Sequence, residues 1–445
     1  MQSDRGMWLG RPWSRRGKSV KYEAMTVLRA NLLRRGDGDR RVTNVELFFD
    51  LVYVFAVTQL SHHLLQHPSV VGALKTALLL AMVWLVWVYT TWVTNWLDPE
   101  RLPVRLMLLV LMLASLVLSA GLPQAFSDRG LWVGVAYAVM QVGRSAFAVA
   151  GLRGDPLQRN FQRILAWCVV SGALAVVGGF TYGGTRVGLW IAVIGVDLLG
   201  GAVGFNTPGL GRSTTEEWTI SGSHFAERCQ AFVLIALGES VVVIGSTLSN
   251  LHSVTSAQVG AFVAAFAGAA ALWWIYFDRS ADAGAQMITD SNDPGRLGRS
   301  AYHFIHPVMI AGIIVTAAAD EQFLTDPTAA VQAPTAWLVL GGTGLFLAGH
   351  AAFKATVWHT IPWTRLIALL LLGLLGLLGL LGLLGLLGAA GPSMPALALA
   401  GATAGIVVLL AAADRMPRHR STARTHHGAA EISKPPPTSS GRRPT

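Results

Sequence analysis

The sequence predicts an all-α polytopic membrane protein with about 12 transmembrane helices. Hydrophobic residues make up 53% of the 445-residue chain, and charged residues make up only 13%, about half the usual share in soluble proteins. The apolar residues are gathered into runs long enough to cross ~30 Å of hydrocarbon as helices. This composition excludes a soluble globular enzyme, because one soluble core could not bury so much apolar surface.

The expected helices correspond to apolar segments separated by polar stretches. A backbone in lipid must satisfy its own hydrogen bonds, and apolar runs of this length favour helices over the alternating strands of a barrel. The segments lie near residues 45–65, 71–92, 104–122, 131–150, 162–181, 187–204, 229–248, 258–277, 303–319, 335–353, 363–388 and 395–413.

Three of these segments have distinctive features. Tryptophans recur from Trp84 to Trp96 in and after the second segment, which is typical of anchoring at the membrane interface. Pro307 predicts a kink in the ninth segment. The eleventh contains a Leu-Leu-Gly repeat over Leu369–Gly388. Glycines three residues apart drift around a helix and form no single packing face, so we interpret this repeat as part of a lipid-facing helix.

The basic residues predict the orientation. The net charge is +10, and in a membrane protein such an excess marks cytoplasmic loops rather than nucleic-acid binding. With the N-terminus inside, only Lys75, Arg129 and Arg186 of the 34 Lys and Arg residues fall outside. If one span were missed, every later loop would be assigned to the opposite side of the membrane. The positive-inside rule therefore favours an even number of spans and two cytoplasmic termini.

Three parts are expected along the chain: a basic cytoplasmic tail at 1–41, a transmembrane helical domain at 42–414 and a disordered cytoplasmic tail at 415–445. Within the transmembrane domain, the halves at approximately 42–205 and 225–414 echo each other, for example in the Asp-Pro pairs that follow the second and eighth segments. Six spans per half would give both halves the same orientation. We therefore predict a 6+6 parallel internal repeat.

Carboxylates inside the apolar segments are the main candidates for function, because an ionisable group in a span is costly and usually faces the bundle interior or water. Glu46 and Asp50 are one turn apart on the first segment and share a helix face with Tyr53. Two carboxylates placed in this way repel each other unless one is protonated or a cation lies between them. Glu239 lies in the middle of the seventh segment, and Asp197 in the middle of the sixth.

The candidate ion path or buried polar core also includes charges near the cytoplasmic ends of the spans. It comprises Glu46, Asp50, Glu227, Arg228, Glu239, Asp278, Arg279 and His306. One interpretation is a proton or cation relay with Glu239 and Asp50 as carriers, and with Arg228, Arg279 or Arg144 as their counter-charges. The other is a set of ion pairs that locks the helix packing.

No metal, cofactor or catalytic site is expected. Cys168 and Cys229 form no CxxC motif, and the histidine pairs lack the further ligands of a zinc site. No nucleotide-binding or hydrolase motif stands in a strand–helix context, so we do not expect an enzyme. The expected partners are the lipid bilayer and a small solute or proton, with no nucleic acid.

Four sequence blocks carry a family resemblance. The segment at 45–56 reads VELFFDLVYVFA and resembles the opening motif of the bacterial low temperature requirement protein A family. Blocks similar to the same family are Glu227-Arg228 together with ALGES at 236–240, YFDR at 276–279 and YHFIH at 302–306. The eight candidate residues lie in or close to these blocks. The resemblance implies a multi-pass protein of the bacterial inner membrane with a link to growth in the cold, and it implies no substrate or reaction.

Two functions follow from these observations. Twelve spans, a parallel repeat and buried carboxylates favour a proton- or cation-coupled secondary transporter of unknown substrate. The basic tails and the family's name favour a non-transporting membrane sensor or scaffold involved in cold adaptation. An intramembrane enzyme acting on lipid would lack a recognisable catalytic set.

Overall fold

The chain forms helices almost throughout its described part. The computed structural model describes residues 32–34, 41–214, 220–386 and 395–415. All of these except Arg415 belong to one compact unit, residues 1–414. Most of the predicted N-terminal tail, and all of the predicted C-terminal tail except Arg415, lie outside the described residues. Within the described part the only strand-like pairings are isolated β-bridges.

Twelve long helices are described, and they match the predicted segments. They are α2 (Asn44–Gln66), α3 (Val70–Trp96), α4 (Leu102–Gly121), α5 (Gly130–Gly151), α6 (Leu157–Phe180), α7 (Gly183–Ala202), α8 (Gly222–Ser249), α9 (Ser256–Phe277), α12 (His306–Thr325), α13 (Ala333–Trp358), α14 (Trp363–Leu386) and α15 (Ala396–Arg415).

Eleven candidate membrane spans are found among the described residues, which confirms an all-helical multi-pass architecture. The twelfth long helix, α14, contains the Leu-Leu-Gly tract, and the end of that tract lies outside the described residues. The 6+6 repeat and the cytoplasmic placement of both termini stay predictions.

The connection between α9 and α12 is mostly helical rather than a simple loop. It contains α10 (Ser280–Thr289), α11 (Pro294–Leu297) and the π-helix η3 (Gly298–Ile305), which leads directly into α12. Pro307, where a kink is predicted, lies in the first turn of α12.

Proline has no N–H, so the carbonyl of His303, four residues before Pro307, loses its α-helical partner. That carbonyl accepts a hydrogen bond from Nε1 of Trp84 at 2.8 Å instead. The π-helix and this bond from α3 together accommodate the proline.

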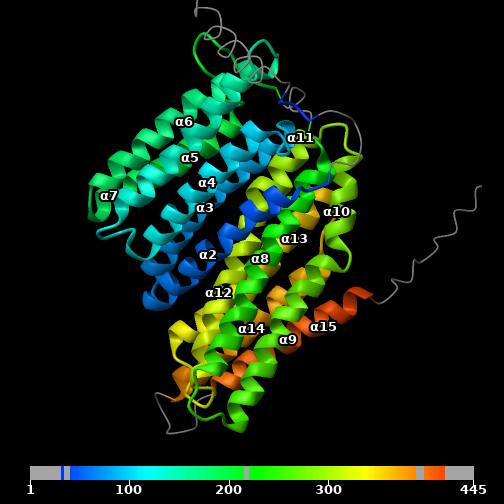
Figure 1. The fold of residues 1–445 in the computed structure, drawn as a ribbon. Coiled ribbons are helices and arrows are strands. Elements are labelled where there is room, and N and C mark those ends of the chain that lie inside the picture. The colour runs from blue at the N-terminus through cyan, green and yellow to red at the C-terminus, as the bar shows by residue number, and fades with distance from the viewer. Residues whose placement is uncertain (1–31, 35–40, 215–219, 387–394, 416–445) are drawn as a thin grey trace, which may run out of the picture. The chain divides into compact units, whose positions relative to one another are not determined.

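Two helices of the first half, α2 and α3, pack against helices of the second half. In the first half α4, α5, α6 and α7 pack in succession, and in the second half α12 packs against α8 and α13 (Figure 1). Both α2 and α3 contact α8 and α12. The interface between the halves is therefore formed by helices that carry predicted acidic residues, since Glu46 and Asp50 lie on α2 and Glu239 lies on α8.

A short piece of the predicted N-terminal tail packs against the end of α3. The N–H of Arg34 donates to the carbonyl of Trp96 at 2.8 Å, and the N–H of Asp98 donates to the carbonyl of Leu32 at 2.8 Å. The Leu32 side chain is buried. This pairing places the Arg34 side chain beside the start of α2.

Candidate functional site

Arg228 on α8 joins the two carboxylates of α2. Its Nε and Nη2 donate to Oδ2 and Oδ1 of Asp50 at 2.8 and 2.6 Å. Its Nη1 donates to Oε1 of Glu46 at 3.1 Å. All three side chains are almost completely buried. The guanidinium is therefore the cation that two carboxylates one turn apart require between them.

Glu46 has further partners that the sequence did not indicate. Nη2 of Arg34 lies 2.8 Å from both carboxylate oxygens, and Nε2 of His224 lies 3.0 Å from Oε1. The N–H and the hydroxyl of Thr43 donate to Oε2 at 3.0 and 2.9 Å. Glu46 thus accepts hydrogen bonds from the donors of Thr43 at the start of α2, and it also positions the side chains of Arg34 and Arg228.

Polar side chains of α3 complete this network. Nε1 of Trp87 donates to Oδ1 of Asp50 at 2.7 Å, and the Thr94 hydroxyl accepts from Nη1 of Arg228 at 3.3 Å. Asn95 exchanges two hydrogen bonds with the backbone of Ser221, just before α8, at 2.8 and 3.0 Å. The result is a network of paired charges that ties α2, α3 and α8 together.

Glu239 lies apart from this network. It is 1% exposed, and its Oε2 accepts a hydrogen bond from the Thr58 hydroxyl at 2.5 Å. Its Oε1 has no hydrogen-bond partner in the described part of the chain. Thr58 is eight residues beyond Asp50 on α2, which corresponds to ~12 Å along a helix. Glu239 and Asp50 are therefore separate sites.

The remaining predicted residues lie elsewhere. Oε2 of Glu227 accepts from the N–H of Val42 at 3.4 Å, close to the start of α2. Nε of Arg279 lies 3.7 Å from Oδ2 of Asp278, and the Arg279 side chain is 65% exposed. Arg279 therefore lies at the end of α9 rather than beside a buried carrier.

His306 occupies a third buried position. Its Nδ1 donates to the Ala301 carbonyl at 3.1 Å, and its Nε2 lies 2.8 Å from the Tyr276 hydroxyl. Its ring stacks on Tyr302 with the centroids 4.7 Å apart. These contacts hold η3 against α9, and none of them joins His306 to the Arg228 network.

A second polar network surrounds Asp197 of α7. The Tyr137 hydroxyl and Nε2 of Gln141 donate to its Oδ2, the amide at 2.7 Å. Oε1 of Gln141 in turn accepts from Nη2 of Arg144. Arg144 is fully buried, and its Nε has no hydrogen-bond partner among the described residues. Gln141 thus bridges a buried cation and a buried carboxylate.

Arg144 also lines a cavity of about 70 Å³. The cavity lies between α3, α5, α6, α7 and the segment that follows α7 on one side, and α11 and η3 of the second half on the other. Its aromatic lining consists of Tyr89, Trp92, Trp96, Phe161 and Phe205. The two halves of the chain therefore share one aromatic cavity, whereas the positions of the tryptophans in the sequence predicted interfacial anchoring only.

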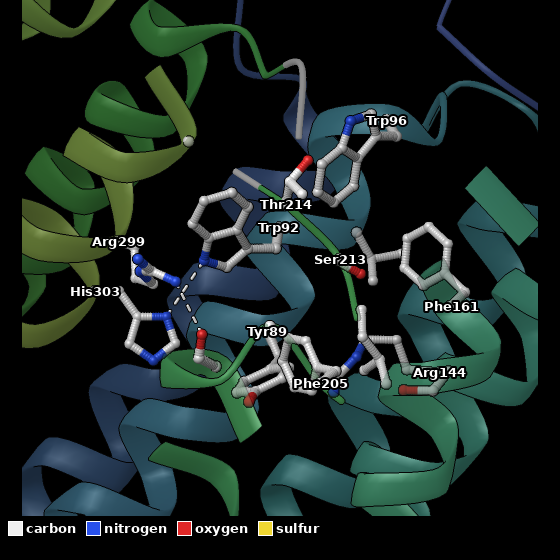
Figure 2. Close-up of a pocket in the computed structure, with 16 residues that line it drawn as sticks. Tyr89, Trp92, Trp96, Arg144, Phe161, Phe205, Ser213, Thr214, Arg299 and His303 are labelled. Atoms are coloured by element: carbon white, nitrogen blue, oxygen red, sulfur yellow. Dashed lines mark hydrogen bonds between the residues drawn. The ribbon is translucent and has the colours of Figure 1, made fainter. Parts of the chain in front are cut away.

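Basic groups lie on two sides of this cavity. Figure 2 shows Arg299 and His303 on one side and Arg144 on the other. Nη1 of Arg299 donates to the Gly201 carbonyl at 2.9 Å, and Nε1 of Trp92 donates to Nδ1 of His303 at 3.3 Å. No Asp or Glu is among the described residues that line the cavity. Aromatic walls with basic groups suit a small solute that has an apolar part and a negative charge.

Within the described ranges, no three His, Cys, Asp or Glu side chains are grouped as metal ligands. Cys168 and Cys229 are both free and buried.

The fold and these sites define a class: a multi-pass helical membrane protein with buried charges between its helices. The sequence model described as bacterial low temperature requirement A protein (LtrA) matches residues 41–412, so the chain belongs to this family. An uncharacterized protein of Rhizobium meliloti (strain 1021) is 38% identical over 344 residues, which is 76% of this chain and 84% of that protein. No solved structure matches the chain.

Proposed function

We propose that the protein is a proton- or cation-coupled secondary transporter of the bacterial inner membrane, and not an enzyme. The observation that carries this proposal is the aromatic cavity between the two halves of the chain. Binding sites of transporters with internal repeats lie at the interface between the repeats, where a relative movement of the halves can expose the site to either side.

The cavity favours a small organic anion as the solute. Arg144 is a buried cation whose hydrogen bonds go to neutral groups, among them the Thr90 hydroxyl and the Val86 carbonyl. Asp197 reaches Arg144 only through Gln141, and Nε of Arg144 has no hydrogen-bond partner among the described residues. A buried charge is stabilised when an opposite charge approaches it, so a carboxylate solute could pair with this guanidinium directly. A volume of about 70 Å³ limits the solute to a few heavy atoms in this conformation.

Glu239 is the proton carrier in this proposal. It is buried, and the hydrogen bond that it accepts comes from a neutral hydroxyl, that of Thr58, whereas Asp50 accepts from a guanidinium. Asp50 is held by two nitrogens of Arg228, and we assign it to positioning α2 against α8.

Transport by purified protein in liposomes tests this function. An imposed pH gradient is followed with an internal pH-sensitive dye while small carboxylates, amino acids, amines and inorganic cations are added one at a time. We expect a small carboxylate to collapse the pH gradient in liposomes that contain the wild-type protein. Liposomes with Glu239→Gln should respond like protein-free liposomes. The protein-free liposomes correct for weak acids that cross the bilayer without a transporter.

The matched control is Glu100→Gln, because the Glu100 side chain is 59% exposed and the substitution is chemically the same. This variant should transport like wild type. If no solute distinguishes wild type from protein-free liposomes, the transport proposal fails and the alternative becomes the better one: a membrane sensor or scaffold whose cold-growth phenotype depends on the tails and not on Glu239.

A further inference from the structure

Asp320 is a buried carboxylate that the predicted polar core does not include. It lies on α12 and is 3% exposed. Its Oδ2 has no hydrogen-bond partner among the described residues. Asp50, by contrast, is held by Arg228, and Asp414 is held by Arg365. Asp320 therefore differs from these paired carboxylates in having an oxygen that no donor in the described part of the chain satisfies.

Asp320 lines a small cavity between α9, α12, α13 and α15. The volume of this cavity is about 30 Å³, and one water-sized particle needs ~10–15 Å³ on this measure. Three threonines, Thr316, Thr343 and Thr403, share the lining. The space is therefore large enough for one small ion beside the carboxylate.

The threonines offer oxygen atoms to this space. The Thr403 hydroxyl is buried and has no hydrogen-bond partner in the described chain. The Thr316 hydroxyl donates its hydrogen to the Gly312 carbonyl at 2.9 Å, which leaves its lone pairs available. The cavity thus combines one carboxylate with hydroxyl oxygens, which are the ligands that hard cations prefer.

Among the described residues that line this cavity, no basic side chain balances the charge of Asp320. The described lining consists of Asp320, the three threonines and Ala, Gly, Leu, Phe and Val residues, without Lys, Arg or His. A lone carboxylate in such surroundings is strongly disfavoured unless it is protonated or binds a cation. A divalent ion usually draws on several carboxylates, so one carboxylate with neutral oxygens suits a monovalent cation.

We propose that Asp320, together with the hydroxyls of Thr316, Thr343 and Thr403, binds a sodium ion. The ion would sit between α9, α12, α13 and α15 and would hold these helices together. The described lining of this site shares no residue with the aromatic cavity and does not include Glu239. Sodium binding at Asp320 does not require that the protein be a transporter.

Thermal unfolding of the full-length protein in detergent tests the proposal. The midpoint temperature of unfolding is measured in sodium chloride, in potassium chloride and in choline chloride. All three solutions have the same ionic strength and the same mildly alkaline pH. A ligand that binds only the folded state raises the midpoint as its concentration rises. We expect sodium to raise the midpoint by a few degrees relative to choline in wild type, with a smaller effect of potassium.

The variants separate sodium binding from folding. Asp320→Asn removes the charge and keeps the shape, so the protein should fold and lose the sodium effect. Thr403→Val should keep the fold and raise the half-saturating sodium concentration ~10-fold or more. Asp326→Asn, the same change at an exposed residue six positions later, should respond to sodium like wild type.

Direct binding of radioactive sodium to the purified protein gives the second measurement, with Asp320→Asn as the blank. Equal midpoints of wild type in sodium and choline, together with no radioactive sodium bound above this blank, would overturn the proposal. Retention of the full sodium effect in Asp320→Asn would overturn it as well. Both readouts are independent of transport, so a failure of the transport function leaves this test intact.

Discussion

At the scale of single residues, Arg228 decides how charge is accommodated between α2, α3 and α8. Its planar guanidinium presents several N–H donors in a fixed arrangement, so it can bind Asp50 through two nitrogens while a third nitrogen reaches Glu46. A lysine ammonium is a compact point charge and could not reproduce this geometry. Removing one partner of a buried pair leaves an unpaired charge in the core, which costs ~3–5 kcal/mol.

We therefore predict strong coupling between Arg228 and Asp50. Arg228→Gln and Asp50→Asn should each destabilise the protein by ~3 kcal/mol or more, and the double variant should be less destabilised than the sum of the two, because it leaves no unpaired charge. The measurement is a double-mutant cycle on unfolding in detergent.

The control for this cycle is the exposed pair Arg105–Glu100, whose side chains are 43% and 59% exposed. Its removal should change stability by less than ~1 kcal/mol. Additive effects at Arg228 and Asp50 would contradict the proposed role of the network.

Part of this network could be predicted from the sequence. The four-residue spacing of Glu46 and Asp50 predicted a shared face and the need for a cation between them. The identity of the other partners could not be predicted, because Arg34 is 12 residues and His224 is 178 residues from Glu46 in the chain. Asp320 was missed for a simpler reason: the ninth apolar segment was predicted to end at 319, whereas α12 continues to Thr325.

At the scale of elements, glycines allow α12 and α13 to approach closely. A Cβ atom built on Gly342 would lie 2.6 Å from the backbone nitrogen of Thr316, and one built on Gly312 would lie 2.4 Å from that of Phe346. In a bilayer, helices associate through close packing of small residues, because lipid tails are as apolar as the side chains they would replace. The contact between α12 and α13 therefore depends on these two glycines.

We predict that Gly342→Val destabilises the protein by ~1–3 kcal/mol or more, because the backbone of α12 must move away. The neighbouring Gly341→Val is the matched control, since a Cβ there meets nothing within 4 Å. Unfolding followed by tryptophan fluorescence should show a lower midpoint for Gly342→Val only. Equal midpoints for the two variants would rule out the close approach.

At the scale of the whole molecule, the placement of basic residues is the main guide to orientation. Arg186, which the predicted topology places outside, is buried and donates to the carbonyls of Thr181 and Ala125 at 2.8 and 2.7 Å. It serves to satisfy free carbonyls at helix ends. A basic residue with this structural role does not argue against the positive-inside pattern.

The predicted topology can be tested with an impermeant maleimide on intact cells that carry single-cysteine variants. The background is Cys168→Ser with Cys229→Ser, both of which replace buried thiols. Ser127→Cys, in the turn after α4, should be labelled from outside in intact cells. Asn292→Cys, between α10 and α11, should be labelled only after the membrane is permeabilised. The reverse pattern would invert the topology, and labelling of both sites from outside would show that the number of spans between them is wrong.

The sequence by itself determined the membrane class, the positions of the helices, the family and several of the residues that carry buried charge, among them Glu46, Asp50 and Glu239. Each of these follows from local patterns: the length of apolar runs, the spacing of residues along a helix and short motifs. The tertiary structure alone decided which charges pair, that Glu239 and Asp50 are separate, and that an aromatic cavity and a threonine-lined Asp320 cavity lie between the helices. These features depend on helices that are distant in the chain and pack together, so no local pattern encodes them.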